Sequence, residues 1–216
     1  MRDDMNKKFI FIHIPKTAGI TIRNILSKYD TYQFKNNYTG HKCDANWWIN
    51  HLGEREFNKN FLFTIIRNPF DRLVSIYFYY LNGGNQGVED KKFGEIFPNN
   101  FKDFILDIDN IDYVNRHCIF KEIWKNVRPT EPQYTRIFNN TNVKNDHSLY
   151  LIKFENLQED FDIVCNKIGI PIQKLPHKNK TKHKHYTEYY DDETKEIVAE
   201  KYAKDIKYFG YEFGES

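Results

Sequence analysis

The chain has 216 residues, of which 40% are hydrophobic, 29% are charged and 17% are Phe, Trp or Tyr. This apolar content suffices for a sizeable core, which excludes wholesale disorder, and the length favours a single domain over residues 1–216. With 32 Lys and Arg against 30 Asp and Glu, the net charge is +2. A protein that binds nucleic acids over its whole surface would carry a larger excess, so no nucleic-acid partner is expected and any preference for anions must be local.

Several features bear on the compartment in which the chain works. The longest apolar stretches, Leu62–Ile66 and Val74–Leu81, are too short to span a bilayer, and the charged start Met1–Lys8 carries no signal-peptide pattern. The cysteines are odd in number and widely spaced: Cys43, Cys118 and Cys165. Such spacing fits reduced thiols better than a disulfide framework. The sequence therefore predicts a cytoplasmic protein without a membrane span.

Segments of strand and helix character alternate along the chain. Short runs of β-branched and aromatic residues predict buried strands, and apolar residues at helical spacing predict helices. The predicted strands are Phe9–Ile14, the weaker Thr31–Phe34, Phe61–Ile66 and Leu149–Phe154. The predicted helices are Ile20–Tyr29, Ala45–Leu52, one from Phe70 that ends at Gly83-Gly84, Phe101–Ile108, Tyr113–Phe120, Leu157–Ile168 and Glu193–Tyr208, with a surface loop at Asn85–Pro98. This alternation predicts an α/β fold with a mostly parallel central sheet flanked by helices.

The first candidate site is the turn between the Phe9–Ile14 strand and the helix that follows it. In open parallel sheets, ligands bind beyond the carboxyl ends of the strands. The turn carries Lys16, the hydroxyl of Thr17 and the small pair Ala18-Gly19. Backbone N–H groups at a helix start favour an anion, to which an ammonium and hydroxyls can also bind. The alternative is an ordinary turn with a capping Thr and a solvated Lys, and the Walker A spacing G-x-x-x-x-G-K-[ST] is absent.

A second turn of the same kind follows the Phe61–Ile66 strand. Arg67 stands at the strand end, where a guanidinium can hold a phosphate through two parallel hydrogen bonds. Ser75 lies about two turns into the next helix. Asp71 falls in the first helical turn and is expected to be a structural cap, and Arg72 is expected to pair locally with an acid.

Together, the two turns resemble the donor-binding motifs of sulfotransferases. Pro15–Thr21 (PKTAGIT) is similar to the 5′-phosphosulfate loop of that family, and Arg67–Tyr77 (RNPFDRLVSIY) is similar to its 3′-phosphate motif. The likeness is greatest to carbohydrate sulfotransferases of the heparan-sulfate 2-O type and their compact bacterial counterparts. It continues in Ile152–Leu157 (IKFENL), Leu175–Lys180 (LPHKNK) and Asp205–Tyr211 (DIKYFGY), and so covers nearly the whole chain. Ile20 departs from the pattern, because many relatives carry Ser or Thr there.

The resemblance implies a P-loop-kinase-like sulfotransferase fold and 3′-phosphoadenosine 5′-phosphosulfate (PAPS) as the sulfuryl donor. It assigns the 5′-phosphosulfate to the first turn, the 3′-phosphate to Arg67 and Ser75, and a lid over that phosphate to Lys180–Lys182. The donor-binding residues implied in this way are Lys16, Thr17, Ala18, Gly19, Ile20, Thr21, Arg67, Ser75, Lys180, Thr181 and Lys182. For the basic segment Lys174–His185, a solvated loop or contacts of its outer lysines with a polyanionic glycan are the alternatives.

Sulfuryl transfer needs positive charge on the leaving oxygen and a base for the acceptor's proton. Lys16 suits the first role, because its compact ammonium can move from the donor phosphate to the bridging oxygen. His41, in Thr39-Gly40-His41, is favoured as the base, because histidine accepts a proton near neutral pH. In the related carbohydrate enzymes, a Gly-His between the two phosphate motifs carries the base. The rivals of His41 are His51, Glu54 and Glu56, and His13 is expected to be a core residue.

Other chemistries find less support in the sequence. The pairs His41-x-Cys43 and His117-Cys118 are isolated, so no metal site is expected, and a Ser-His-Asp arrangement or a GxGxxG fingerprint is missing. Four aromatic residues could face a sugar ring but are favoured as core: Trp47, Trp48, Tyr113 and Trp124.

The sequence thus predicts a sulfotransferase that moves a sulfuryl group from PAPS to a hydroxyl, expected to be on a carbohydrate. A non-catalytic module that binds the nucleotide or a sulfated glycan is the alternative; it would keep Lys16 and Arg67 but lack a working base. A nucleotide kinase is disfavoured, because the Walker A glycines are missing.

Overall fold

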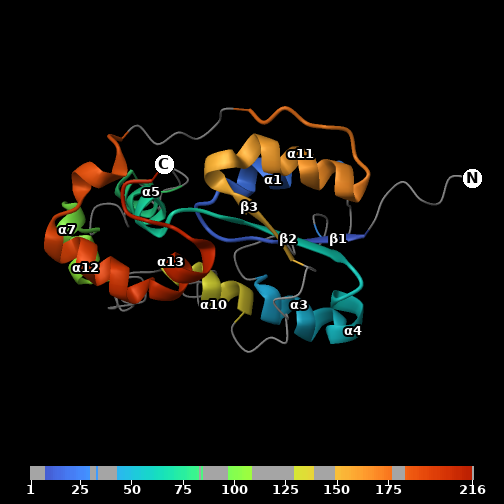
Figure 1. The fold of residues 1–216 in the computed structure, drawn as a ribbon, viewed down its shortest axis with the longest axis horizontal. Coiled ribbons are helices and arrows are strands. Elements are labelled where there is room, and N and C mark those ends of the chain that lie inside the picture. The colour runs from blue at the N-terminus through green and yellow to red at the C-terminus, as the bar shows by residue number, and fades with distance from the viewer. Residues whose placement is uncertain are drawn as a thin grey trace, which may run out of the picture. The chain divides into compact units, whose positions relative to one another are not determined.

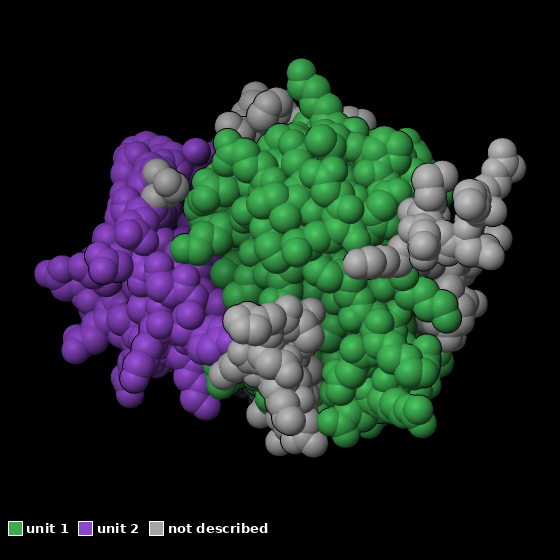
Figure 2. All heavy atoms as spheres, turned by 45° about the vertical axis from the view of Figure 1, so that its right-hand side comes forward, with its two compact units in different colours: residues 1–67, 133–178 green, residues 68–132, 179–216 purple. Residues whose placement is uncertain are grey.

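The computed structural model describes residues 8–29, 33, 43–82, 84, 97–108, 129–138, 149–176 and 183–215. The chain forms two compact units, residues 1–67 with 133–178 and residues 68–132 with 179–216 (Figure 2). It passes from one unit to the other after residues 67, 132 and 178, so no single cut along the sequence separates them. The single domain implied by length and resemblance stays a prediction.

A three-stranded parallel sheet forms the centre of the first unit (Figure 1). Its strands lie in the order β1 (Phe9–Ile12), β2 (Phe61–Ile66) and β3 (Leu149–Lys153). Phe9 is in register with Phe61, and Leu62 with Leu149. Every residue of β1 is buried, as expected for a continuous apolar run that is covered on both faces. Of the weak strand predicted at Thr31–Phe34, only Gln33 lies within the described residues.

Helices cover both faces of this sheet (Figure 1). They are α1 (Gly19–Leu26) and α11 (Leu157–Ile168) on one face, and α3 (Ala45–Leu52), α4 (Glu54–Phe57) and α10 (Gln133–Phe138) on the other. Successive strand residues point to opposite faces, so Ile10 and Phe11 belong to separate hydrophobic clusters. Trp48 is fully buried in the cluster of Ile10, which confirms it as a core residue, whereas Trp47 is half-buried. The predicted α/β class with a parallel sheet is therefore confirmed.

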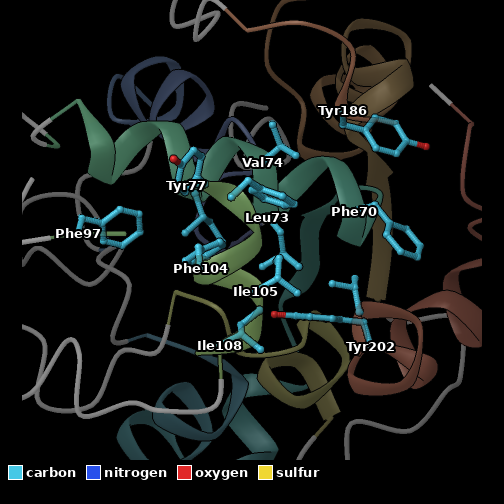
Figure 3. Packing of buried hydrophobic residues seen from close by; sticks show 13 residues of the cluster. Phe70, Leu73, Val74, Tyr77, Phe97, Phe104, Ile105, Ile108, Tyr186 and Tyr202 are labelled. Carbon is cyan, nitrogen blue, oxygen red and sulfur yellow. The ribbon is translucent and has the colours of Figure 1, made fainter. Parts of the chain in front are cut away.

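The described residues of the second unit form helices and turns. Its elements are α5 (Pro69–Leu81), α7 (Phe101–Leu106), the 3₁₀ turn Tyr186–Tyr189, α12 (Asp192–Lys201) and α13 (Ala203–Phe209). Their apolar faces enclose one core, in which Leu73, Tyr77, Ile105 and Tyr202 are buried together (Figure 3). Arg72, on the buried side of α5, donates hydrogen bonds to the carbonyl oxygens of Pro129 (3.0 Å) and Glu131 (2.6 Å). Arg72 thus anchors the residue 129–131 segment to α5, which is a structural role.

The continuous helix predicted over Glu193–Tyr208 is in fact two helices that meet at Tyr202. The backbone of Tyr202 leaves the helical region, with φ −104° and ψ 21°. Its fully buried side chain donates a hydrogen bond to the carbonyl oxygen of Thr130. This tertiary contact coincides with the break, and no Gly or Pro marks the position in the sequence.

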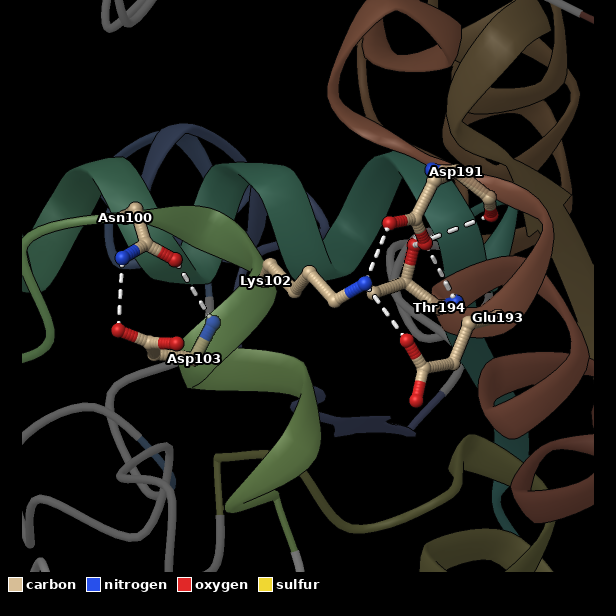
Figure 4. A network of polar contacts seen from close by, with 6 residues as sticks. All are labelled: Asn100, Lys102, Asp103, Asp191, Glu193 and Thr194. Atoms are coloured by element: carbon tan, nitrogen blue, oxygen red, sulfur yellow. Dashed lines mark hydrogen bonds and ion pairs between the residues drawn. The ribbon is translucent and has the colours of Figure 1, made fainter.

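Polar contacts hold the start of α12 (Figure 4). The Asp191 carboxylate accepts a hydrogen bond from the Thr194 backbone N–H (2.8 Å), while the Thr194 hydroxyl accepts one from the Asp191 N–H (3.0 Å), which completes a capping box. Lys102 of α7 pairs with both Asp191 (2.8 Å) and Glu193 (2.6 Å). These ion pairs are exposed, so the buried Thr194 hydroxyl is expected to matter more for stability than the lysine.

We expect Thr194→Val to lower the free energy of unfolding by about 1 kcal/mol, because valine keeps the volume of threonine but removes the hydroxyl from the capping box. In thermal unfolding this corresponds to a drop in Tm of about 2–4 °C. Thr187→Val is the control, because the Thr187 hydroxyl is bonded to exposed His185 and caps no helix, and its Tm should stay near that of the wild type. Equal Tm values for the Thr194 variant and the wild type would contradict the role of the capping box.

Candidate functional site

The turn between β1 and α1 contains two non-glycine residues in the left-handed conformation. Lys16 has φ 67° and Ala18 has φ 66°. Such backbone costs about 1–3 kcal/mol per residue and is concentrated at binding sites and active sites. Left-handed residues that alternate with others turn successive backbone N–H groups toward one point, which forms a concave nest for an anion. The backbone itself therefore favours an anion at this turn.

The helix start adds to this preference. Ala18 is the N-cap of α1, and alanine has no side-chain oxygen that could accept a hydrogen bond from the first-turn N–H groups. The first intrahelical bonds run from the N–H groups of Thr21 and Ile22 to the Ala18 carbonyl oxygen, at 3.0 and 3.4 Å. The N–H groups of Gly19 and Ile20 precede these bonds and lie at the positive end of the helix dipole.

Two contacts hold the turn from the protein interior. The Thr17 hydroxyl donates to the Ile14 carbonyl oxygen at 2.9 Å, and its side chain is fully buried. Gly19 lies against the His13 ring, where a Cβ would come within 2.2 Å of the ring atoms Cδ2 and Nε2. His13 itself is buried and stacks on Phe11 with the ring centroids 5.7 Å apart, which confirms it as a core residue. Any larger residue at position 19 would have to displace this ring.

Arg67, at the end of β2, reaches the same turn. Its Nη1 donates a hydrogen bond to the Lys16 carbonyl oxygen at 3.1 Å across a separation of 51 residues. Its Cζ lies 4.1 Å from the ring centroid of Phe154, so the guanidinium stacks on an aromatic face. The side chain of Gln133 bonds to both polar groups of the Arg67 backbone. The structure therefore brings Lys16 and Arg67 together.

The two cations affect each other. Burial, and secondly the charge of Arg67, lower the pKa of Lys16 from 10.5 to about 8. Both causes disfavour the ammonium form, and an anion beside the two side chains would favour it. The site thus combines a backbone nest with two basic side chains, which is the chemistry of a phosphate or sulfate site.

This arrangement agrees with what the comparisons find for the whole chain. The sulfotransferase family matches residues 1–212. The chain belongs to the sulfotransferase family. An uncharacterized protein of Archaeoglobus fulgidus is 31% identical over 126 residues, which make up 58% of this chain and 82% of that protein. No solved structure matches the chain. The reaction class is therefore sulfuryl transfer, and the three-stranded parallel sheet with flanking helices is consistent with the P-loop-like fold of sulfotransferases.

The other residues expected at the donor site of this sulfotransferase lie in different parts of the chain. Ile20 is 48% exposed on the first turn of α1, whereas Thr21 is buried. Ser75 is buried on α5, in the second unit, and its contact with the donor stays a prediction. Lys180, Thr181 and Lys182 lie outside the described residues, as does the expected base, His41.

The rival bases of the sulfotransferase are described. His51 is exposed at the end of α3 and stacks on Trp47, with the ring centroids 4.7 Å apart. Glu56 forms an ion pair with Lys59 at 2.8 Å, and the hydrogen bond and charge of Lys59 lower the pKa of its carboxyl. A carboxylate with a lowered pKa is a weaker proton acceptor, so Glu56 is a poorer candidate for the general base than a carboxylate with an ordinary pKa. Glu54 is exposed at the start of α4.

The helix after Arg67 differs from prediction at its cap. The N-cap of α5 is Asn68, whose side-chain oxygen accepts a hydrogen bond from the Phe70 N–H at 3.1 Å. Pro69 occupies the first helical position, which places the cap one residue before it. The prediction of Asp71 as the cap is therefore wrong, although Asp71 does lie in the first turn.

Two residues that hold Arg67 were missed by sequence reasoning. Phe154 lies within the family-like stretch Ile152–Leu157, which was its only signal. Gln133 carries no local signal, because it is 66 residues from its partner.

In the described parts of the chain, no group of three or more His, Cys, Asp or Glu side chains is arranged to hold a metal ion. Within the same ranges, every helix is too short or too polar to cross a membrane. Cys43 and Cys165 are buried, and Cys118 lies outside the described residues.

Proposed function

We propose that this sulfotransferase moves a sulfuryl group from PAPS to a hydroxyl of a carbohydrate and releases adenosine 3′,5′-bisphosphate. The observation that carries the proposal is the meeting of the Lys16 turn with the Arg67 guanidinium. These are the two places where the family-like donor motifs stand in the sequence. A donor with phosphate groups at both its 3′ and 5′ positions suits a site that offers several positive groups.

The donor is assigned to these groups by charge and by resemblance. The backbone N–H groups of the turn and the Lys16 ammonium bind the 5′-phosphosulfate, and Thr17, Ala18, Gly19, Ile20 and Thr21 complete that loop. Arg67 and Ser75 bind the 3′-phosphate, and Lys180–Lys182 close over it. The nest-forming backbone at Lys16 and Ala18 supports the first assignment.

The transfer is a single displacement at sulfur. His41 takes the proton of the acceptor hydroxyl while the hydroxyl oxygen forms the new bond to sulfur. At the same time the bond between sulfur and the 5′-phosphate oxygen breaks. Lys16 neutralises the negative charge that develops on the leaving phosphate oxygen. The acceptor thereby becomes a sulfate ester and adenosine 3′,5′-bisphosphate leaves. The proton stays on His41 until solvent removes it.

A carbohydrate acceptor is supported by the resemblance to heparan-sulfate 2-O-type enzymes and by the basic segment Lys174–His185. If the outer lysines of this segment bind a polyanionic glycan, salt should weaken acceptor binding more than donor binding. The odd number and wide spacing of the three cysteines fit reduced thiols, and on this ground we propose that the enzyme works in the cytoplasm.

The proposed reaction is tested with ³⁵S-labelled PAPS and a panel of mono-, oligo- and polysaccharides. We expect label to appear on at least one sugar and a matching amount of bisphosphate to form. Binding of the bisphosphate without sulfation of any acceptor would instead identify a non-catalytic module. Sulfation of non-sugar hydroxyls alone would overturn only the carbohydrate assignment.

The affinity for adenosine 3′,5′-bisphosphate is expected to fall as the pH rises above 8. In the free protein Lys16 has a pKa of about 8, and a bound anion raises it, so binding at higher pH requires the uptake of a proton. The dissociation constant should therefore be flat below that pH and increase by up to about tenfold per pH unit above it. The free energy of unfolding depends on pH in the opposite direction. In the unfolded chain Lys16 keeps its ordinary pKa of 10.5, so the unfolded state binds more protons and the free protein becomes more stable between pH 8 and 10.5.

Calorimetric titrations at pH 7 to 10 measure this dependence. Lys16→Arg is the matched control, because a guanidinium stays charged over the whole range and should give a flat profile. A wild-type profile as flat as that of the arginine variant would contradict the assignment of the titrating group to Lys16.

A further inference from the structure

We propose that Gln133 is a positioning residue for sulfuryl transfer: its side-chain amide clamps the Arg67 peptide and thereby holds the Arg67 guanidinium beside the Lys16 turn. This inference rests on the proposed function, because it gives Gln133 a purpose only if Arg67 binds the donor. It concerns a residue on α10, whose sequence position gives no hint of such a role.

The clamp consists of two hydrogen bonds to one residue. The Arg67 N–H donates to Gln133 Oε1 at 2.9 Å, and Gln133 Nε2 donates to the Arg67 carbonyl oxygen at 2.8 Å. The Gln133 side chain is fully buried. An amide that pairs with both the N–H and the C=O of one residue acts as a neighbouring β-strand would.

The clamp lies where the sheet ends. The pairing of β2 with β1 ends at Thr64, and its pairing with β3 ends at Ile66, opposite Lys153. Arg67 is the next residue, just beyond these described strand pairings, and its backbone N–H and C=O pair with the Gln133 side chain. Gln133 takes the place of a neighbouring strand and fixes the backbone of one more residue, Arg67, whose side chain reaches the Lys16 turn.

A fixed peptide matters because the arginine side chain is long and flexible. Its guanidinium meets the Lys16 carbonyl oxygen at 3.1 Å and the Phe154 ring at 4.1 Å only if the backbone holds its direction. An arginine side chain that is free to adopt other rotamers loses conformational entropy when it is ordered by a ligand. With the clamp in place, this ordering precedes binding.

The chain contains a matched control for this clamp. Gln33 also pairs its amide with a strand through two hydrogen bonds, but to two residues of β1: its Oε1 accepts from the Phe11 N–H at 3.1 Å, and its Nε2 donates to the Phe9 carbonyl oxygen. Gln33 is also buried. The residues it clamps carry core side chains, so its loss should affect stability without affecting the site.

The test compares Gln133→Met with Gln33→Met. Methionine keeps the length and volume of glutamine and removes both hydrogen bonds. We expect the Gln133 variant to bind adenosine 3′,5′-bisphosphate about tenfold more weakly, while the Gln33 variant keeps the wild-type affinity at a similar loss of Tm. If Gln133→Met does not fold, Gln133→Asn, whose amide is one methylene too short, replaces it with the same expected direction.

A second readout needs no donor. If the guanidinium leaves the turn, the pKa of Lys16 should rise above 8, because Arg67 is one of the two causes that lower it. This pKa can be followed by NMR of the ¹³C-methylated lysine in the wild type and both Met variants. Only the Gln133 variant is expected to show the rise, since a general loss of stability does not move it.

A double-mutant cycle completes the test. In an Arg67→Met background, Gln133→Met should cause no further loss of affinity, because its effect acts through Arg67. Additive losses, equal losses for the two glutamine variants, or an unchanged Lys16 pKa would overturn the inference. If the wild-type protein fails to bind the bisphosphate, the proposed function fails, and the Lys16 pKa still decides whether Gln133 positions Arg67.

Discussion

Replacing Lys16 by methionine is expected to lower kcat for sulfuryl transfer by about 10²–10³-fold, which is the effect of removing one group that stabilises developing charge. Methionine keeps the length and apolar stem of the side chain and removes the ammonium. The partly buried position of Lys16 beside Arg67 makes its charge more effective, because less water screens it than at the surface. The measurement is the rate of ³⁵S transfer at saturating donor and acceptor, together with the affinity for the bisphosphate.

Lys59→Met is the matched control for this variant. Lys59 lies in the same unit, but its side chain is 58% exposed, it pairs with Glu56 on the surface, and it is not among the proposed donor-binding residues. Its replacement should leave the transfer rate within about twofold of the wild type, since surface substitutions of this kind change little. A Lys16 variant with the activity of the Lys59 variant would remove Lys16 from the mechanism.

Replacing His41 by alanine is expected to lower kcat by about 10²–10⁴-fold and to leave bisphosphate affinity unchanged. The reason is that a general base acts on the acceptor proton, whereas the proposed function assigns donor binding to the Lys16 turn and Arg67. The acidic limb of the pH–rate profile, which an ordinary histidine base places near pH 6.5, should also disappear.

His51→Ala is the control for this variant, because His51 is the exposed rival that stacks on Trp47. It should retain the transfer rate and the acidic limb. The opposite outcome, a wild-type rate for the His41 variant and a large loss for the His51 variant, would transfer the role of base to α3.

Much of the fold could be predicted because the strands are continuous apolar runs. The bounds of β2 and α3 agree with Phe61–Ile66 and Ala45–Leu52, and α11 ends before Gly169 as predicted. The meeting of the two turns followed from the same pattern, since β1 and β2 are parallel neighbours whose carboxyl ends lie at one edge.

What the sequence did not predict depends on contacts between distant residues. The left-handed backbone at Lys16 and Ala18 contradicts local preference, because both are non-glycine residues. The break at Tyr202 accompanies the burial of its side chain beside Thr130, and the clamp of Gln133 on Arg67 joins residues 66 positions apart. Local periodicity carries no information about such pairs.

The most direct test of the central claim is a calorimetric titration of adenosine 3′,5′-bisphosphate into the wild-type protein and into Lys16→Met and Arg67→Met variants. If the two turns form one site for the donor, the wild-type protein binds the bisphosphate, both variants bind it at least about tenfold more weakly, and ATP with magnesium does not compete. Absence of binding to the wild-type protein, or equal affinity in all three proteins, would contradict the account.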